Sequence, residues 1–309
     1  MTKGIPIAVE PFVDDELRAA VEESGGSLVS PEEAAGLVWT NPGDSEGLKE
    51  VLATSPVRWV QLPFAGIESF VAAGVLDTER TWTCTKGAYG RSTAEHALAL
   101  MLCAARLIHF HARERRWREA GLGLPEFDLK NRTAVVIGTG GIGSHLTAML
   151  GPLEARVIGV NRSGRPLAGA KATITSDSLG QVIGEADFVV LAAAATPETR
   201  HLIDADMLSR MRSSAWLVNV ARGSLVDTDA LVEALSSRGI AGAALDVTEP
   251  EPLPESHSLW GMDNVVITPH IANTWDMALP ELRSVVRRNV AHFVSGRPLE
   301  GVVDVELGY

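Results

Sequence analysis

The chain has 309 residues, a length that suits two domains better than a single core. Hydrophobic residues make up 46% and charged residues 21%, which is typical of a globular protein and excludes a disordered, collagen-like or coiled-coil chain. The formal net charge of −12 disfavours binding to nucleic acid or to an anionic membrane surface.

Neither a targeting segment nor a metal site is indicated. The first ten residues are typical of a strand rather than of a signal sequence, and no apolar run is long enough to span a bilayer. The two cysteines, Cys84 and Cys103, are too few for a disulfide framework and lack metal-ligand spacing. We therefore expect a cytoplasmic protein with no metal.

Apolar runs alternate with amphipathic stretches along the chain, the pattern of parallel α/β folds. In the first part we predict strands at 5–9, 37–39 and 58–62 and helices at 14–23 and 45–53. A long helix begins near Ser92, with apolar residues at three- and four-residue spacings. Six further strands are predicted at 133–138, 156–160, 187–192, 215–220, 241–247 and 264–268, with helices between them, most clearly at 227–236.

The end of the chain indicates how the domains are connected. After Pro269 the pattern predicts one more helix, roughly 278–294, and then a tail without a sheet of its own, so we expect this region to return to the first domain. The predicted fold is α/β with two doubly wound parallel-sheet domains. A Rossmann cofactor domain, residues 98–276, is inserted in a discontinuous flavodoxin-like substrate domain, residues 1–97 and 277–309.

A glycine-rich loop, GTGGIG, lies directly after a predicted strand and opens a helix. Such a loop alone is weak evidence, because glycines also serve plain tight turns. Its position favours dinucleotide binding, since glycines let the backbone approach a pyrophosphate whose charge the helix N-terminus stabilises. The residues expected to bind the cofactor here are Gly138, Gly140, Gly141, Ile142 and Gly143.

The residues after the second strand of this domain bear on cofactor choice. NAD-preferring proteins carry an acidic residue there, which bonds the ribose 2′-hydroxyl. This chain has Asn161, Arg162 and Ser163, whose amide, guanidinium and hydroxyl suit a 2′-phosphate. The sequence predicts that NADP(H) is preferred, and a solvated turn with NAD(H) bound stays the alternative.

Three polar residues follow successive strands of the second series: Arg222, Glu251 and His270. Ligands of open α/β sheets bind at the carboxyl ends of the strands, so we expect the three to converge. A guanidinium can hold a carboxylate, and an imidazolium can give a proton to a carbonyl oxygen. A carboxylate beside the imidazole would fix its tautomer, and Glu249 competes with Glu251 for that role.

These motifs, taken in order, resemble those of the D-isomer-specific 2-hydroxyacid dehydrogenase family. They are the glycine loop, TPETRHLI (196–203), NVARGSLVD (219–227), ALDVTEPEPLP (244–254) and ITPHIA (267–272). The resemblance implies that Arg222 binds the substrate carboxylate and carbonyl, that His270 is the catalytic acid/base, and that Glu251 is its partner. It favours Glu251 over Glu249.

The resemblance also implies further contacts. The backbone at Ala65 and Gly66 would receive the substrate carboxylate, and Asp246 would hold the nicotinamide carboxamide. Additional cofactor contacts would come from Thr196, Val220 and Ala221.

Within the family, short glyoxylate and hydroxypyruvate reductases are most similar in pattern. Phosphoglycerate-oxidising relatives carry an arginine after an early strand, where this chain has Trp39, Thr40 and Asn41. We therefore expect an NADP-dependent reductase of a small 2-keto acid. The alternatives are an NAD-dependent D-3-phosphoglycerate dehydrogenase-like enzyme and a non-catalytic nucleotide-sensing protein of the same fold.

The segment 113–119 alternates arginines with glutamates, which indicates a solvated helix end or a subunit contact rather than a nucleic-acid site. Trp117 in this segment resembles a tryptophan that some family members insert across a dimer interface. We expect a homodimer that acts on small molecules, with no nucleic-acid or membrane partner. His96 is expected to pack or hydrogen-bond at a helix start rather than to catalyse.

Overall fold

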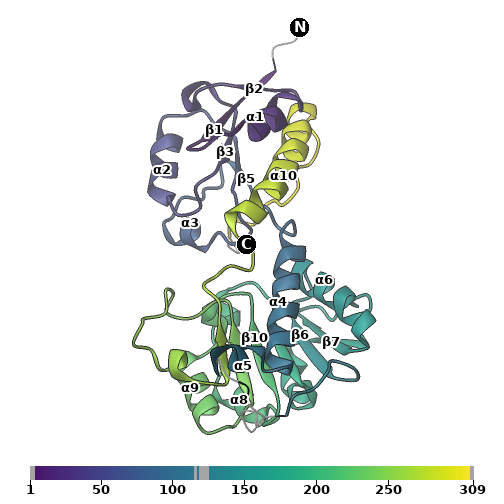
Figure 1. The fold of residues 1–309 in the computed structure, drawn as a ribbon. Helices are drawn as coiled ribbons and strands as arrows, with labels where there is room; N and C mark the ends of the chain where they lie inside the picture. The colour runs from purple at the N-terminus through teal and green to yellow at the C-terminus, as the bar shows by residue number, and fades with distance from the viewer. Residues whose placement is uncertain (1–3, 115–116, 118–124, 307–309) are drawn as a thin grey trace. The chain divides into compact units, whose positions relative to one another are not determined.

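The computed structural model describes residues 4–114, 117 and 125–306 of the chain. The chain forms two compact units, the first from the residues up to 89 together with those from 275 onward, and the second from residues 90–274 (Figure 1). The predicted boundary after residue 97 falls inside a helix, α4 (Gly90–Ala105), whereas the structure divides the units at the start of that helix. The reason is that α4 packs mainly on elements of the second unit, above all on α6.

The first unit contains a five-stranded parallel sheet of order β2-β1-β3-β4-β5, the flavodoxin-like order. Its strands are β1 (Ile5–Glu10), β2 (Gly26–Leu28), β3 (Gly36–Trp39), β4 (Trp59–Gln61) and β5 (Thr81–Thr83). Its helices are α1 (Asp15–Glu22), α2 (Ser45–Ala53), α3 (Glu68–Ala72) and α10 (Trp275–Ser295).

Helices cover both faces of this sheet. On one face, Leu17 of α1 and Leu282 of α10 share a core with Ile7 of β1. On the other face, Leu48 of α2 and Phe70 of α3 form a second core. The prediction that the chain returns to its first domain after Pro269 is confirmed, because α10 completes this unit.

The second unit contains a seven-stranded parallel sheet of order β12-β11-β10-β9-β6-β7-β8, the Rossmann order with one added strand. Its strands are β6 (Thr133–Ile137), β7 (Arg156–Asn161), β8 (Ala172–Thr175), β9 (Phe188–Leu191), β10 (Trp216–Asn219), β11 (Gly242–Leu245) and β12 (Val265–Ile267). Its helices are α4, α5 (Ile108–Glu114), α6 (Gly141–Leu150), α7 (Leu179–Val182), α8 (Ala205–Arg210) and α9 (Thr228–Ser236).

Successive residues of β6 serve opposite faces of this sheet, as the two-residue period of a strand requires. Val135 and Ile137 pack with α7, α8 and α9, while Ala134 and Val136 pack with α4 and α6. Among the described residues, no helix is long and apolar enough to cross a membrane.

Three strands of the structure were not predicted: β2, β5 and β8. All three lie at sheet edges, with three or four residues each. An edge strand is covered on fewer sides than an interior one, so it needs less apolar sequence and leaves a weaker pattern.

Candidate active site

The glycine loop connects β6 to α6 in the second unit. Gly138 has φ +100°, and a Cβ there would lie 2.4 Å from the carbonyl oxygen of Ala192, so only glycine fits. Gly140 precedes the helix without a side-chain cap, and the first turn has no acidic residue. That turn consists of Gly141, Ile142 and Gly143. Since the first amides of a helix lack intrahelical acceptors and attract anions, the loop fits a pyrophosphate.

Asn161 ends β7 and organises the turn that follows. Its Nδ2 donates to Thr139 Oγ1 at 2.8 Å and to the Arg165 carbonyl at 2.9 Å. Its Oδ1 accepts from the backbone amide of Ser163 at 3.1 Å. These bonds engage both ends of the amide, so Asn161 shapes the loop, in which Arg162 and Ser163 are exposed.

Arg162 lies near the short helical turn at 197–199. The pKa of Glu198 is lowered by hydrogen bonds from the Thr196 side chain and from its own backbone, and also by the positive charge of Arg162. Thr196 opens this turn after β9, and its amide donates to Thr199 Oγ1 at 2.8 Å. The predicted cofactor residues Arg162 and Thr196 therefore both neighbour Glu198.

The turn after β10 presents Arg222. Buried Asn219 holds the turn closed, because its Oδ1 accepts from the Ala221 amide at 3.0 Å and its Nδ2 donates to the Arg222 carbonyl at 2.9 Å. Val220 and Ala221 are buried, whereas Arg222 is half-buried with Nη1 bonded to the Ala221 carbonyl at 2.7 Å. Asn219 was not predicted as a site residue, although a polar residue ending an apolar strand is a usable signal.

His270 and Glu251 are in direct contact. Nδ1 of His270 lies 2.6 Å from Oε1 of Glu251, and the side chains are 48% and 41% exposed. The competing residue Glu249 contacts Arg200 and His201 instead. Glu251 thus engages one of the two ring nitrogens of His270, Nδ1, and Nε2 is the other.

Asp246 organises the loop that carries His270. Its side chain is 1% exposed and accepts hydrogen bonds from Thr268 Oγ1 at 2.6 Å and from the amides of Ile271 at 2.9 Å and Ala272 at 3.0 Å. The His270 amide in turn donates to the Asp246 carbonyl at 2.8 Å. Asp246, which the resemblance predicted to hold the nicotinamide carboxamide, thus has a structural role in this loop.

His96 on α4 completes this arrangement, with Nε2 3.0 Å from Thr268 Oγ1 and 3.2 Å from Asp246 Oδ1. Burial raises the pKa of Asp246, but hydrogen bonds from His96, Thr268 and the two backbone amides outweigh it and lower the pKa to about 2. His96 therefore hydrogen-bonds near a helix start, as the sequence predicted.

The predicted substrate residues Ala65 and Gly66 lie in the first unit, between β4 and α3. Ala65 is exposed and Gly66 half-buried. The preceding Phe64 is fixed by ring contacts to Tyr89, with centroids 5.5 Å apart, and to Trp275 at 5.9 Å. The ring contacts of Phe64 thus support the backbone of this loop within the first unit.

A cavity of about 430 Å³ lies in the second unit, and none of the predicted site residues lines it. It lies near the amino ends of the strands, at the edge of this sheet opposite the one that carries Arg222 and His270. Its lining consists of Lys130, Asn131, Arg132, Thr133, Arg156, Glu185, Asp187 and Arg212. Arg132 Nη1 lies 3.3 Å from Asp187 Oδ1, so part of the lining forms ion pairs.

Trp117 is described by the structure and is 95% exposed. Most of the basic segment around it, including Arg115, Arg116 and Arg118, lies outside the described residues. Its predicted contact with a partner subunit stays a prediction.

The sequence is similar to known proteins along its whole length. Residues 98–272 match the family model described as D-isomer specific 2-hydroxyacid dehydrogenase, NAD binding domain. An uncharacterized protein from the proB 3′ region of Corynebacterium melassecola is 38% identical over 305 residues, covering 97% of this chain and 98% of the other. A glyoxylate reductase of Pyrococcus furiosus is 34% identical over 233 residues, covering 73% of this chain and 69% of that enzyme.

The fold also matches a solved structure of an NADPH-dependent glyoxylate/hydroxypyruvate reductase from Sinorhizobium meliloti in complex with NADP and sulfate. The TM-score is 0.79 at 25% identity, and the match covers 99% of this chain and 100% of the other.

Proposed function

The chain belongs to the D-isomer specific 2-hydroxyacid dehydrogenase family, and on that premise we propose that it reduces a small 2-keto acid with NADPH. As an oxidoreductase with a nicotinamide-binding domain, it requires a hydride donor and a proton donor. The observation that carries the proposal is the His270–Glu251 pair on the same sheet edge as Arg222 and the glycine loop.

The proposed reaction assigns one task to each residue. Arg222 holds the substrate carboxylate, and His270 gives its proton to the carbonyl oxygen. Glu251 orients the imidazole through Nδ1 and stabilises the imidazolium before the proton leaves. When bound, the nicotinamide supplies the hydride to the carbonyl carbon, and the product is a D-2-hydroxy acid.

Preference for NADPH is supported by the turn after β7, which carries Arg162 and Ser163 and has no carboxylate between residues 161 and 165. A carboxylate at this point would repel the 2′-phosphate, whereas the guanidinium attracts it. The Sinorhizobium relative, an NADPH-dependent enzyme, supports the same choice.

The residues at the end of β3 in the first unit support a substrate like glyoxylate or hydroxypyruvate. Trp39 Nε1 donates to the Asn41 carbonyl at 2.6 Å, and Thr40 Oγ1 donates to the Glu10 carbonyl at 3.0 Å. These side chains serve the turn and bring no cation for a substrate phosphate. The relative from Pyrococcus furiosus is named a glyoxylate reductase.

A homodimer is part of the proposal. It is supported by the apolar side chains that residues 102–117 leave exposed: Leu102 at 37%, Ile108 at 53% and Trp117 at 95%. Burying such side chains against a second copy is favourable. Sedimentation equilibrium at micromolar concentration should give the mass of two chains.

The test is a panel of glyoxylate, hydroxypyruvate and 3-phosphohydroxypyruvate assayed with NADPH and with NADH. We expect the two small acids to be reduced with NADPH. A preference for the phosphorylated acid would favour a phosphoglycerate dehydrogenase-like enzyme, and NADPH binding without any turnover would favour a nucleotide-sensing protein.

A further inference from the structure

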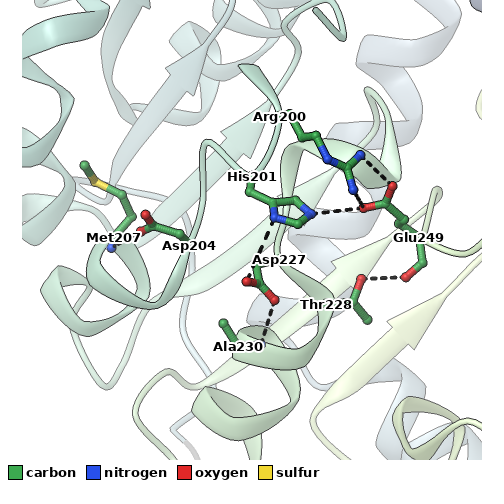
Figure 2. A network of polar contacts seen from close by, with 8 residues as sticks. All are labelled: Arg200, His201, Asp204, Met207, Asp227, Thr228, Ala230 and Glu249. Carbon is green, nitrogen blue, oxygen red and sulfur yellow. Dashed lines mark hydrogen bonds and ion pairs between the residues drawn. The ribbon is translucent and has the colours of Figure 1, made fainter. Parts of the chain in front are cut away.

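Glu249 is the centre of a charged cluster beside the site (Figure 2). Arg200 Nη1 donates to Glu249 Oε1 at 2.9 Å, and Arg200 Nη2 donates to Oε2 at 3.4 Å. His201 Nε2 lies 3.2 Å from the same Oε2. Both carboxylate oxygens are therefore engaged, and Arg200 and His201 together lower the pKa of Glu249 against the opposing effect of burial.

The backbone around Glu249 is also held. Thr228 Oγ1, at the start of α9, donates to the Glu249 carbonyl at 2.6 Å. A Cβ on Gly223 would lie 2.0 Å from the Thr248 carbonyl carbon, so this glycine allows the two loops to touch. The loop with Glu251 is thus seated directly on the turn that follows Arg222.

The segment that supplies Arg200 and His201 is bound to that same turn. The His201 amide donates to the Ser224 carbonyl at 2.8 Å, and the Ile203 amide donates to the Leu225 carbonyl at 2.9 Å. His201 has φ +50°, a conformation that non-glycine residues seldom adopt. Such a conformation persists where surrounding contacts determine it, and here those contacts connect the Arg222 turn to Glu249.

Glu251, by contrast, is 41% exposed and contacts His270. The contact that anchors its loop to Arg200 is made by the neighbouring Glu249. The two glutamates two residues apart therefore contact different partners.

We propose that the Arg200–His201–Glu249 cluster is a positioning device that holds Glu251, and through it His270, at a fixed place relative to Arg222. The inference rests on the proposed reduction, in which Arg222 binds the substrate and His270 protonates it. Glu249 is a positioning residue in this scheme, because its contacts are to Arg200 and His201 rather than to reacting groups.

The experiment compares Glu249→Gln with Asp206→Asn in the full-length protein. Glu249→Gln keeps the size of the side chain but removes its charge, and charge-assisted bonds are the stronger ones. Asp206→Asn is the matched control, because Asp206 pairs with Arg210 at 2.8 Å on the exposed surface of α8. We expect kcat for keto-acid reduction to fall about tenfold in Glu249→Gln and to stay unchanged in the control.

Further measurements separate a loss of positioning from a loss of folded protein. Titration with NADPH should give the same binding stoichiometry and Kd in both variants, and the solvent deuterium isotope effect on kcat should rise only in Glu249→Gln. Exchange of the backbone amides of residues 246–249 and 251 should be faster in Glu249→Gln than in Asp206→Asn. The double variant Arg200→Ala with Glu249→Ala should be little worse than Glu249→Ala alone, because the glutamate variant already removes the contact with Arg200.

The outcomes distinguish this inference from the proposed function. If the wild-type protein reduces no keto acid, the proposed function fails and the exchange rates alone decide whether the cluster holds the loop. If the wild type is active and Glu249→Gln matches the control in kcat, the positioning role is overturned, even where exchange is faster.

Discussion

His270 carries the proton in the proposed reaction, and the geometry around it makes its removal a direct test. We expect His270→Ala to lower kcat for keto-acid reduction by roughly 10²–10⁴, the usual contribution of a positioned acid. The Kd for NADPH should be nearly unchanged, because the glycine loop and Arg162 are untouched. Steady-state kinetics and a fluorescence titration with NADPH measure the two quantities.

The control for this change is His292→Ala. His292 lies on α10 in the first unit, where its Nδ1 is 2.7 Å from the Pro298 carbonyl oxygen. Its removal should leave kcat unaltered. A His270→Ala variant as fast as His292→Ala would show that the proton comes from another group.

Arg162 is the residue on which the cofactor prediction depends. Replacing it with Ala should narrow the NADPH/NADH ratio of kcat/KM by about tenfold, mainly by weakening NADPH, since a charge-assisted phosphate bond contributes about 1.5–3 kcal/mol. Arg156→Ala, at the amino end of the same strand, makes the same change in net charge and should leave the ratio as it is. An unchanged ratio in Arg162→Ala would contradict the prediction.

At the scale of elements, the loop after β12 depends on the Asp246 carboxylate. The pKa of Asp246 is about 2 against an ordinary 3.8, so its ionised form stabilises the fold above about pH 4. That stabilisation, about 2 kcal/mol, is lost as the pH falls through about 2. Asp246→Asn lacks it at every pH.

Urea unfolding of both proteins tests this directly. The difference in free energy of unfolding between wild type and Asp246→Asn should be about 2 kcal/mol larger near pH 6 than near pH 2. Asp206→Asn is the control, because it removes an exposed ion pair with Arg210, and surface ion pairs contribute little to the free energy of unfolding. A difference independent of pH would mean that the variant loses only neutral hydrogen bonds.

At the scale of the whole molecule, the second unit is one continuous segment with its own cores on both faces of its sheet. We expect the fragment 90–274 to fold and to bind NADPH, because the glycine loop and Arg162 both belong to it. It should reduce no keto acid, since Ala65 and Gly66 belong to the first unit. Circular dichroism, NADPH fluorescence and a turnover assay measure these outcomes.

The same fragment with Gly138→Ala is the control for specific binding. The added Cβ would collide with the Ala192 carbonyl, so NADPH binding should be lost. Turnover by the unaltered fragment would show that the reduction of a keto acid requires only the second unit.

Local sequence patterns determined many of the strands and candidate site residues of this protein. The interior strands and the glycine loop were predicted, because apolar periodicity and glycine spacing act over a few residues. Arg222, Glu251 and His270 were predicted from their places after strands, whereas Asn219 was not. The edge strands β2, β5 and β8 left no such pattern, since fewer of their residues must be buried.

Only the tertiary structure decided which polar residues of the site contact each other. Two glutamates in TEPEP are alike as sequence, yet Glu251 contacts His270 while Glu249 contacts Arg200 and His201. Likewise, His96 meets Asp246 across 150 residues of chain. These pairings depend on which loops the sheet brings to one edge, and such contacts between distant segments leave no periodic mark on the sequence.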